Sequence, residues 1–457
     1  MGSKWIEVSL GEISEKIGDG IHGTPVYNDS GNYYFINGSN LSDNSIKITD
    51  TTKRVDHDEF LKHRKELGDN TVLVSINGTI GNTALYNNEN IILGKSACYI
   101  NLKDSISKYF ILYILSGYLF QEYIQRCSTG STIKNVSLKM MRDFRFLMPE
   151  SKEDQEKAVY IIQKVDERKR LSNAQNQTLE QMSKTLFKSW FVDFDPVIDN
   201  ALDTGNPIPE ALQSRAELRQ KARNSADFKP LPADLRALFP AEFEETEMGW
   251  VPKGWSVTEL GQLVTVKRGG SPRPIHDFLR ADGFPWVKIS DATASSTRFL
   301  MSTKEFIKSE GLNKTVFLKK GSLILSNSAT PGLPKFLDIE ACIHDGWLYF
   351  PEKEKLTDVY LYNLFLEIKE QLISQGNGSV FTNLKTDILK QFKITVPGKD
   401  IISYFDKLGT ELHKKILDIT KNTETLTALR DTLLPKLISG ELSLEDLPDL
   451  VTQTEPA

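Results

Sequence analysis

Val72-Leu73-Val74-Ser75 is a short apolar run that ends in a serine, and Leu323-Ile324-Leu325-Ser326 repeats it in the second half of the chain. Runs of this length and composition favour buried β-strands. The similarity continues outward on both sides, so that residues 5–149 and 255–397 run in parallel. The other matching pairs are Leu10-Gly11 with Leu260-Gly261, Thr24-Pro25 with Ser271-Pro272, Tyr34-Phe35-Ile36 with Pro285-Trp286-Val287, Asn135 with Asn383, and Leu147-Met148-Pro149 with Thr395-Val396-Pro397. A repeat as long as a domain predicts two similar lobes rather than a solenoid.

The composition excludes several classes of protein. No apolar run approaches the roughly 18 residues that span a bilayer, and residues 1–5 contain no apolar signal core. The three cysteines are far apart and form no Cys-x-x-Cys pair, which argues against a disulfide framework and against a zinc site. We therefore expect a cytoplasmic protein. The net charge of −5 argues against a protein wrapped in nucleic acid on all sides, but it is compatible with local basic clefts.

Both lobes, residues 1–150 and 251–398, are predicted to be mixed α/β (α+β) domains. In the first lobe, turn residues separate four candidate strands at 33–36, 71–76, 91–93 and 97–102. The near-helical spacing of apolar residues predicts a helix over 108–126. The same pattern near 358–374 predicts its counterpart in the second lobe.

Each lobe is followed by a long segment, residues 151–194 and 399–440, in which residues recur at heptad spacing. The seam residues are Ala158, Val165, Ser172, Leu179 and Leu186 in the first segment and Phe405, Leu412, Ile419, Leu426 and Leu433 in the second. Such seams are typical of helices that pair in a coiled coil; the alternative is that each helix packs on its own lobe. The polar residues of the column three positions further on, which we expect to fix the register, are Arg168, Gln175, Lys415 and Asn422.

Two remaining segments are predicted to have little structure. Residues 195–250 are rich in proline, and we interpret them as a linker with one short helix near 210–221. Residues 441–457 follow Gly440, which ends the second long segment, and form a C-terminal tail.

The sequence lacks the motifs of three kinds of catalytic or nucleotide site. No Asn/Asp-Pro-Pro-aromatic loop of an amine methyltransferase is present. Gly94-Lys95-Ser96 resembles the end of a phosphate-binding loop, but the required first glycine would fall on Glu89. The six histidines are dispersed, so no metal site is predicted. These absences favour a binding protein over an enzyme.

Several basic or polar loops are candidates for binding. The turn at 77–81 could offer backbone amides and the Thr79 hydroxyl to a phosphate, although a plain tight turn explains it equally well. Basic clusters lie at 53–54 and 62–65 and at 267–274, where two prolines flank the cations; each could also be solvated surface. The residues that we predict to contact DNA are Lys53, Arg54, Arg64, Thr79, Lys134, Lys267, Arg268, Ser271, Arg273, Lys288 and Asn327.

The chain resembles the specificity (S) subunits of type I restriction-modification systems. The most specific stretch is Leu186-Phe187-Lys188-Ser189-Trp190-Phe191-Val192-Asp193-Phe194-Asp195-Pro196. The other stretches that carry the likeness are 75–81, 255–261, 269–272, 284–291 and 433–442. They occur in the family's order and extend over essentially the whole chain. Lobe one departs from the common pattern at 20–25, where it has no basic cluster.

The resemblance implies two target recognition domains, each of which reads one half of a bipartite site in double-stranded DNA. It implies that the two conserved helices pair as an antiparallel coiled coil that sets the gap between the half-sites. It also implies assembly with two methyltransferase subunits and with restriction/translocase subunits. S-adenosylmethionine, ATP and Mg are then expected on those partners, and this chain is expected to bind no cofactor and to be non-catalytic. The competing interpretation is a two-lobed scaffold that does not read DNA.

Overall fold

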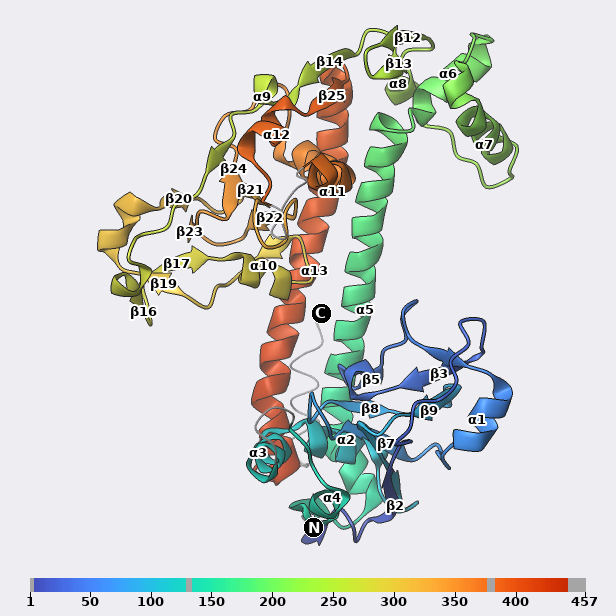
Figure 1. The fold of residues 1–457 in the computed structure, drawn as a ribbon, viewed down its shortest axis with the longest axis vertical. Helices are drawn as coiled ribbons and strands as arrows, with labels where there is room; N and C mark the ends of the chain where they lie inside the picture. Colours follow the sequence, from blue (N-terminus) through green and yellow to red (C-terminus); the bar gives the residue numbers. More distant parts are fainter. Residues whose placement is uncertain (1–3, 129–133, 376–382, 443–457) are drawn as a thin grey trace. The chain divides into compact units, whose positions relative to one another are not determined.

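The computed structural model describes residues 4–128, 134–375 and 383–442 (Figure 1). The chain divides into two compact units. Unit 1 is Met1–Leu171 with Thr423–Ala457, and unit 2 is Ser172–Asn422. Each unit therefore combines one lobe with part of both long helices. Of the predicted C-terminal tail, residues 443–457 lie outside the described residues.

Unit 1 is built on a four-stranded antiparallel sheet in the order β2-β10-β7-β8. A second sheet, β6-β3-β9, contains the parallel pair β3 and β9. β1 pairs with β11, so that the two ends of the lobe meet, and β4 pairs with β5. The strands are β1 (Trp5–Ser9), β2 (Ser14–Asp19), β3 (Tyr33–Ile36), β4 (Leu41–Ser42), β5 (Ser45–Ile46), β6 (Arg54–Val55), β7 (Thr71–Ser75), β8 (Thr83–Leu85), β9 (Ile91–Leu93), β10 (Ala97–Leu102) and β11 (Arg145–Pro149). The four strands predicted for this lobe are confirmed as β3, β7, β9 and β10.

The helices of lobe one are α1 (His57–His63), α2 (Lys108–Ser116), α3 (Tyr118–Cys127), α4 (Leu138–Asp143) and the 3₁₀ helix η1 (Gly38–Asn40). The single helix predicted over 108–126 is wrong, because the chain is extended at Gly117 between α2 and α3. A Cβ atom at Gly117 would lie 3.0 Å from Ile438 Cδ1 and 3.0 Å from the Tyr113 carbonyl oxygen. The absence of a side chain there lets the break pack closely against the end of the second long helix.

Unit 2 repeats this plan with longer sheets. One sheet has the order β15-β24-β21-β22-β18, a second has the order β16-β19-β17-β23-β20, and β14 pairs with β25. The strands are β14 (Ser256–Glu259), β15 (Lys267–Arg268), β16 (Leu279–Arg280), β17 (Phe284–Val287), β18 (Phe299–Leu300), β19 (Phe306–Ile307), β20 (Val316–Leu318), β21 (Leu323–Ser326), β22 (Pro334–Leu337), β23 (Ala341–Ile343), β24 (Trp347–Tyr349) and β25 (Lys393–Val396). The helices are α9 (Leu260–Leu263), α10 (Ile289–Ala294), α11 (Asp358–Gln375), α12 (Thr386–Gln391), and the 3₁₀ helices η3 (Ile275–Asp277) and η4 (Ser309–Lys314).

The sequence repeat is a repeat of structure. The repeated runs 72–75 and 323–326 lie in the inner strands β7 and β21, and all residues of these strands are buried. Near the start of each lobe, the Leu10 amide donates to the Phe144 carbonyl at 2.9 Å, and the Leu260 amide donates to the Phe392 carbonyl at 2.9 Å. The two lobes therefore share one hydrogen-bond frame.

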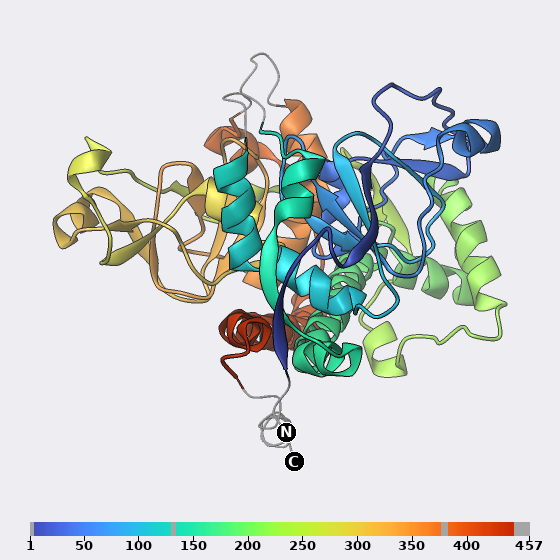
Figure 2. The same ribbon diagram turned by 90° about the horizontal axis from the view of Figure 1, so that it is seen from below.

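The long segments are the helices α5 (Lys152–Phe191) and α13 (Lys399–Ser439), which lie side by side within each unit (Figures 1 and 2). In unit 1, Arg430 lies 3.5 Å from Asp166. In unit 2, the Asn176 side-chain amide donates to the Thr420 hydroxyl at 3.1 Å, and Phe187 contacts Phe405 with ring centroids 5.7 Å apart. Within unit 2, partner numbers fall along α13 as they rise along α5, so the pairing is antiparallel. The helices pair with each other and also join the cores of the lobes.

The seam of the helix pair differs from the prediction in its second column. Val165 is buried, and Leu179, Leu186, Leu412, Ile419 and Leu426 are half-buried, as a seam requires. The polar residues expected in the column three positions further on are all exposed, which makes that prediction wrong: they are Arg168, Gln175, Lys415 and Asn422. The second column lies four positions after the first, and its buried members are Ile162, Asn176, Ser183, Trp190, Gly409, Ile416 and Leu437. Positions three and four residues away flank a helical stripe on opposite sides, and heptad spacing alone does not choose between them.

In each lobe, one side chain forms a hydrogen bond to α5. It lies at the equivalent position of α2 in lobe one and of α11 in lobe two. In unit 1, the Tyr113 hydroxyl on α2 donates to Asp166 at 2.9 Å. In unit 2, Asn363 on α11 accepts from the Ser183 hydroxyl at 3.0 Å. These contacts bridge lobe and helix inside each unit and restrict how the lobe can turn on the helix.

A buried ion pair adds a second attachment in unit 2. The Arg298 side chain is fully buried and donates to both oxygens of Glu180 on α5, at 2.7 and 2.5 Å. Its guanidinium lies 4.5 Å from the ring centre of Tyr362. Nearby, His413 on α13 meets the rings of Phe299 and Phe336 edge-on, with centroids 4.8 and 4.5 Å apart. The Nη1 atom of Arg298 has no hydrogen-bond partner among the described residues. Breaking the ion pair would leave a desolvated charge, so the pair favours one geometry.

Residues 195–250 are folded rather than a linker. They form α6 (Asp195–Thr204), η2 (Glu210–Leu212), α7 (Gln213–Arg223), α8 (Ala233–Arg236), β12 (Phe243–Thr246) and β13 (Gly249–Pro252). Carboxylates spaced four residues apart on α6 meet arginines with the same spacing on α7; the pairs are Asp195 with Arg215, Asp199 with Arg219, and Asp203 with Arg223. The proline-rich composition predicted a linker and did not indicate these ion pairs.

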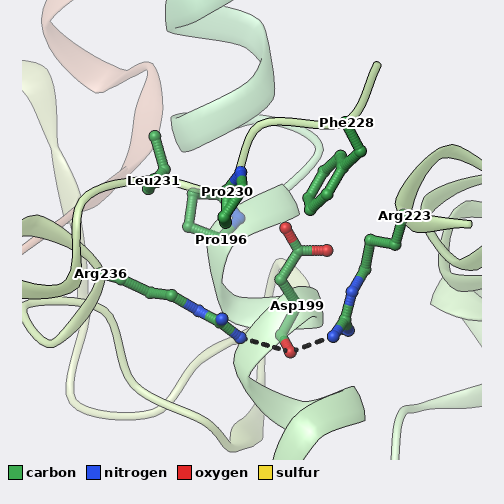
Figure 3. A pocket seen from close by; sticks show the side chains of 7 residues that line it. All are labelled: Pro196, Asp199, Arg223, Phe228, Pro230, Leu231 and Arg236. Atoms are coloured by element: carbon green, nitrogen blue, oxygen red, sulfur yellow. Dashed lines mark hydrogen bonds between the residues drawn. The ribbon is translucent and has the colours of Figure 1, made fainter. Parts of the chain in front are cut away.

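A cavity of about 250 Å³ lies beside α6 (Figure 3). The two arginines that line it, Arg223 and Arg236, donate to the Asp199 carbonyl at 3.2 and 3.0 Å and also pair with Asp203. Both guanidinium groups are thus bound to α6. In the described part of the chain, no helix is long and apolar enough to cross a membrane. Within the same residues, no group of three or more His, Cys, Asp or Glu side chains is placed to hold a metal ion.

Candidate nucleic-acid interface

The basic loop of lobe two starts at the edge strand β15. The Gly269 amide donates to the Trp347 carbonyl at 2.8 Å, and the Gly270 amide donates to the Ile343 carbonyl at 3.1 Å. These bonds hold the loop against the turn 344–346 between β23 and β24. A Cβ atom at Gly269 would lie 2.3 Å from the His344 carbonyl oxygen, so only glycine permits this close approach.

Asp345, in that turn, is the centre of the site. Its carboxylate accepts from the Ser271 hydroxyl at 2.7 Å and from the Arg273 guanidinium at 3.4 Å. Its carbonyl oxygen accepts from Arg268 Nε at 2.5 Å and from the Asn327 amide at 3.5 Å. Four residues predicted to contact DNA are therefore brought together around one acidic residue.

The electrostatics of this cluster keep Asp345 ionised. Partial burial raises the pKa of Asp345, but the Ser271 hydroxyl, His344 and Arg268 lower it, and the net pKa is below the usual value of an aspartate. The Arg273 side chain remains 81% exposed. Lys267 and Arg268 are exposed too, so the cluster presents cations to solvent around the half-buried Asp345.

Two of the lobe-two candidates, Asn327 and Lys288, are less exposed than the cations of the loop. Asn327 is 4% exposed, and its side-chain oxygen has no hydrogen-bond partner among the described residues. Lys288 is half-buried and forms an ion pair with Glu305, with its ammonium 5.8 Å from the ring centre of Trp286. Lys288 is thus separate from the Asp345 cluster and is less free to reach a ligand.

In lobe one, the predicted residues form two groups. Lys53 and Arg54 lie beside aromatic rings: the Lys53 ammonium is 5.9 Å from the ring centre of Tyr27, and the Arg54 guanidinium is 5.1 Å from that of Tyr34. Arg64 is exposed and caps the C-terminus of α1. Cations that rest on aromatic rings are held in place while they stay accessible.

The second group of lobe one is at the turn 77–81. Thr79 is exposed at its tip, and the Gly78 amide donates to the Lys134 carbonyl at 3.0 Å. Lys134 is exposed as well, and its ammonium donates to Gln125. Thr79 and Lys134 are therefore neighbours, which their separation in the sequence did not reveal.

The site contains one residue that the sequence reasoning missed and one pairing that it misplaced. Asp345 lies 74 residues from Ser271, which it binds, and its counterpart segment, 94–96, resembles in sequence only the end of a phosphate-binding loop. The pairing of Thr24-Pro25 with Ser271-Pro272 is wrong by two residues. The Gly20 amide donates to the Ala97 carbonyl as Gly269 does to Trp347, which places Pro25 opposite Pro274.

Comparison with known proteins agrees with this architecture. The type I restriction modification DNA specificity domain matches residues 2–181 and 252–421. The HindI specificity subunit of Haemophilus influenzae is 27% identical over 96% of this chain and 100% of its own length. The MjaIX specificity subunit of Methanocaldococcus jannaschii is 23% identical over 82% of this chain and 78% of its own length. The crystal structure of an S subunit from M. genitalium superposes with a TM-score of 0.54 and 18% identity, covering 95% of this chain and 96% of that one, which shows a shared fold. The chain belongs to the DNA specificity subunits of type I restriction-modification systems.

Proposed function

We propose that each lobe reads one half of a bipartite site in double-stranded DNA. The observation that carries the proposal is the shared hydrogen-bond frame, on which the two lobes display different exposed side chains. A frame that stays constant while its loops vary is suited to holding two different reading surfaces. In lobe two the reading surface is the Asp345 cluster; in lobe one it includes Lys53, Arg54 and the Thr79 turn.

The loop arginines of lobe two have the chemistry for either kind of DNA contact. A guanidinium can bind a guanine edge with two hydrogen bonds or pair with a phosphate. Asp345 accepts hydrogen bonds from Ser271, Arg268 and Arg273 and so orders the loop before DNA binds. Prior ordering reduces the entropy lost on binding.

The helix pair supports a second part of the proposal, which concerns spacing. The number of unspecified base pairs between the half-sites is set by the length of the paired helices α5 and α13. Within each unit the two helices pair through a buried seam, and a helix rises about 1.5 Å per residue, which supports a spacing that depends on helix length.

The remaining parts of the proposal concern partners. The chain recruits two methyltransferase subunits and the restriction/translocase subunits, and it performs no catalytic step itself. S-adenosylmethionine, ATP and Mg then bind to those partners. Membership in the specificity family supports this division of labour.

The test is the double variant Arg268→Ala with Arg273→Ala in the assembled methyltransferase. If an arginine reads a guanine, affinity falls by about 1–3 kcal/mol and specificity relaxes in one half-site only. If both contact phosphates, binding falls for all sequences and the salt dependence becomes shallower. Lys393→Ala serves as the control, because Lys393 lies on β25, in a sheet separate from β15, and pairs with Glu247 in the turn between β12 and β13. Unchanged affinity and an unchanged methylated motif would favour a scaffold that does not read DNA through this loop.

A further inference from the structure

The turn between β9 and β10 in lobe one occupies the same place in the fold as the turn between β23 and β24 in lobe two. In lobe one, the Ile76 amide donates to the Ser96 carbonyl at 2.9 Å; in lobe two, the Asn327 amide donates to the Gly346 carbonyl at 2.8 Å. The glycine approach is repeated as well, because a Cβ atom at Gly20 would lie 2.4 Å from the Gly94 carbonyl oxygen. The turn 94–96 is therefore equivalent to the turn 344–346, and Lys95 stands where Asp345 stands.

The strand beside this turn, β2 in lobe one and β15 in lobe two, also differs in charge between the lobes, but in the opposite sense. Cys98 is the register partner of Asp19, and Leu348 is the register partner of Arg268, so Asp19 stands where Arg268 stands. Lobe two thus has a cation on the strand and an anion on the turn, whereas lobe one has an anion on the strand and a cation on the turn. Asp19 pairs with His22 at 2.9 Å, within lobe one.

Lys95 is free to bind a ligand. Its side chain is exposed, and among the described residues it makes no ion pair and no side-chain hydrogen bond. The turn beneath it is nevertheless well held, because the Ser96 hydroxyl donates to Asn37 at 2.9 Å and accepts from the Gly38 amide at 2.9 Å. A single cation on a fixed turn is positioned for contact with an anionic or hydrogen-bond-accepting partner at little entropic cost.

We propose that Lys95 is a further DNA-contacting cation of lobe one, beside Lys53 and Arg54, and takes the role that Arg268 and Arg273 have in lobe two. This rests on the proposed function, in which each lobe reads a half-site. The ammonium donates to an acceptor on DNA, which is either a phosphate oxygen or the O6 and N7 atoms of a guanine. The exchange of charge between strand and turn then gives the two lobes different reading surfaces on one frame.

The test compares Lys95→Gln with the unchanged protein in the complete methyltransferase complex. Lys103→Gln is the control, since Lys103 follows the other end of β10 and is also exposed, but its ammonium donates to the Glu12 carbonyl at 2.6 Å. Binding to a duplex that carries the methylated motif is measured over a range of salt concentrations, and the motif itself is read by long-read sequencing. Lys95→Arg keeps the charge and is expected to retain most of the binding.

If Lys95 contacts a phosphate, Lys95→Gln weakens binding to all sequences and lowers the salt slope by about one. If it contacts a guanine, affinity falls by about 5- to 150-fold and one position of the lobe-one half-site becomes degenerate. Either result supports the proposal when Lys103→Gln behaves as the unchanged protein does. If the unchanged complex recognises a bipartite motif but Lys95→Gln alters neither affinity nor motif, this proposal fails while the proposed function stands. If the unchanged complex recognises no such motif, the proposed function itself fails.

Discussion

At the scale of single residues, chemistry at the interface depends on partners that are distant in the sequence. The cations of the loop 267–274 could be predicted as candidates from their clustering alone. Asp345 could not, because its role appears only when the turn 344–346 is folded against that loop. Lys95 was visible as part of Gly94-Lys95-Ser96, but its position became meaningful only through the backbone hydrogen bonds that align it with Asp345.

Asp345→Asn should release the loop arginines from their anion. Removing one negative charge beside Arg268 and Arg273 raises the local positive potential, so binding to non-specific DNA should strengthen and its salt dependence should steepen. Discrimination in the lobe-two half-site should fall, because the loop loses an acceptor that orders it. Binding to matched and scrambled duplexes measures both effects. Asp282→Asn, which removes the exposed partner of Arg280, should leave both nearly unchanged. Equal discrimination in Asp345→Asn and the unchanged protein would contradict the role of Asp345.

His413 should make stability depend on pH. Burial, and the positive charge of Arg298, lower the pKa of His413 to about 4, whereas an unfolded histidine titrates near 6.5. Between these values the unfolded chain binds more protons, so stability falls as the pH is lowered from about 6.5 towards 4. The loss is at most about 3 kcal/mol and is reduced by solvent at this half-buried site. His413→Phe keeps an aromatic edge against Phe299 and Phe336. The melting temperature of this variant should depend less on pH between about 4 and 6.5. An unchanged pH profile would show that other groups dominate.

At the scale of secondary-structure elements, heptad spacing predicted the two long helices and their pairing, but it did not predict which residues are buried. The polar residues inside the seam are Ser172, Asn176, Ser183 and Thr420, rather than the column that we expected. The segment 195–250 was misread for a related reason. Its prolines suggested a linker, while the four-residue spacing of Asp195, Asp199 and Asp203, matched by the arginines of α7, was the signal that could have revealed two packed helices.

The Asn176–Thr420 pair should act as a coupled unit in the helix seam. Thr420→Val leaves the buried Asn176 amide without its partner, which should cost about 1–3 kcal/mol. Adding Asn176→Leu removes the unsatisfied group and should recover most of the loss. Melting temperatures of the two single variants and the double variant give the coupling. Thr178→Val is the control, because the exposed Thr178 hydroxyl bonds only to its own helix. Additive effects of the two substitutions would show that the pair is not coupled.

At the scale of the whole molecule, the duplication was the most informative property of the sequence. It predicted two lobes of one fold, and both the matching strands and the matching backbone hydrogen bonds confirm this. The net charge of −5 gave no indication of a DNA interface, because a sum over the chain does not show where basic residues cluster. The bases that each lobe recognises could not be predicted, since they depend on side-chain positions in loops that differ between the copies.

The spacing claim can be tested by lengthening both helices. Four residues inserted after Leu171 in α5 and four after Asn422 in α13 add about 6 Å, close to one helical turn, so the apolar faces are nearly kept. At about 3.4 Å per base pair, this corresponds to one or two additional base pairs. Each insertion lies where the chain passes from one unit to the other, so the lobes themselves are unchanged.

The most direct measurement is the methylated motif, read by long-read sequencing in a host that carries the complete system with either the unchanged chain or this lengthened one. The unchanged chain should give two specific half-sites separated by unspecified bases. The lengthened chain should give the same two half-sites with a spacer longer by one or two base pairs. An active lengthened variant whose spacer is unchanged would contradict the proposal that the helices set the distance. A continuous motif, or altered bases in the half-sites, would contradict the proposal that the two lobes read DNA independently.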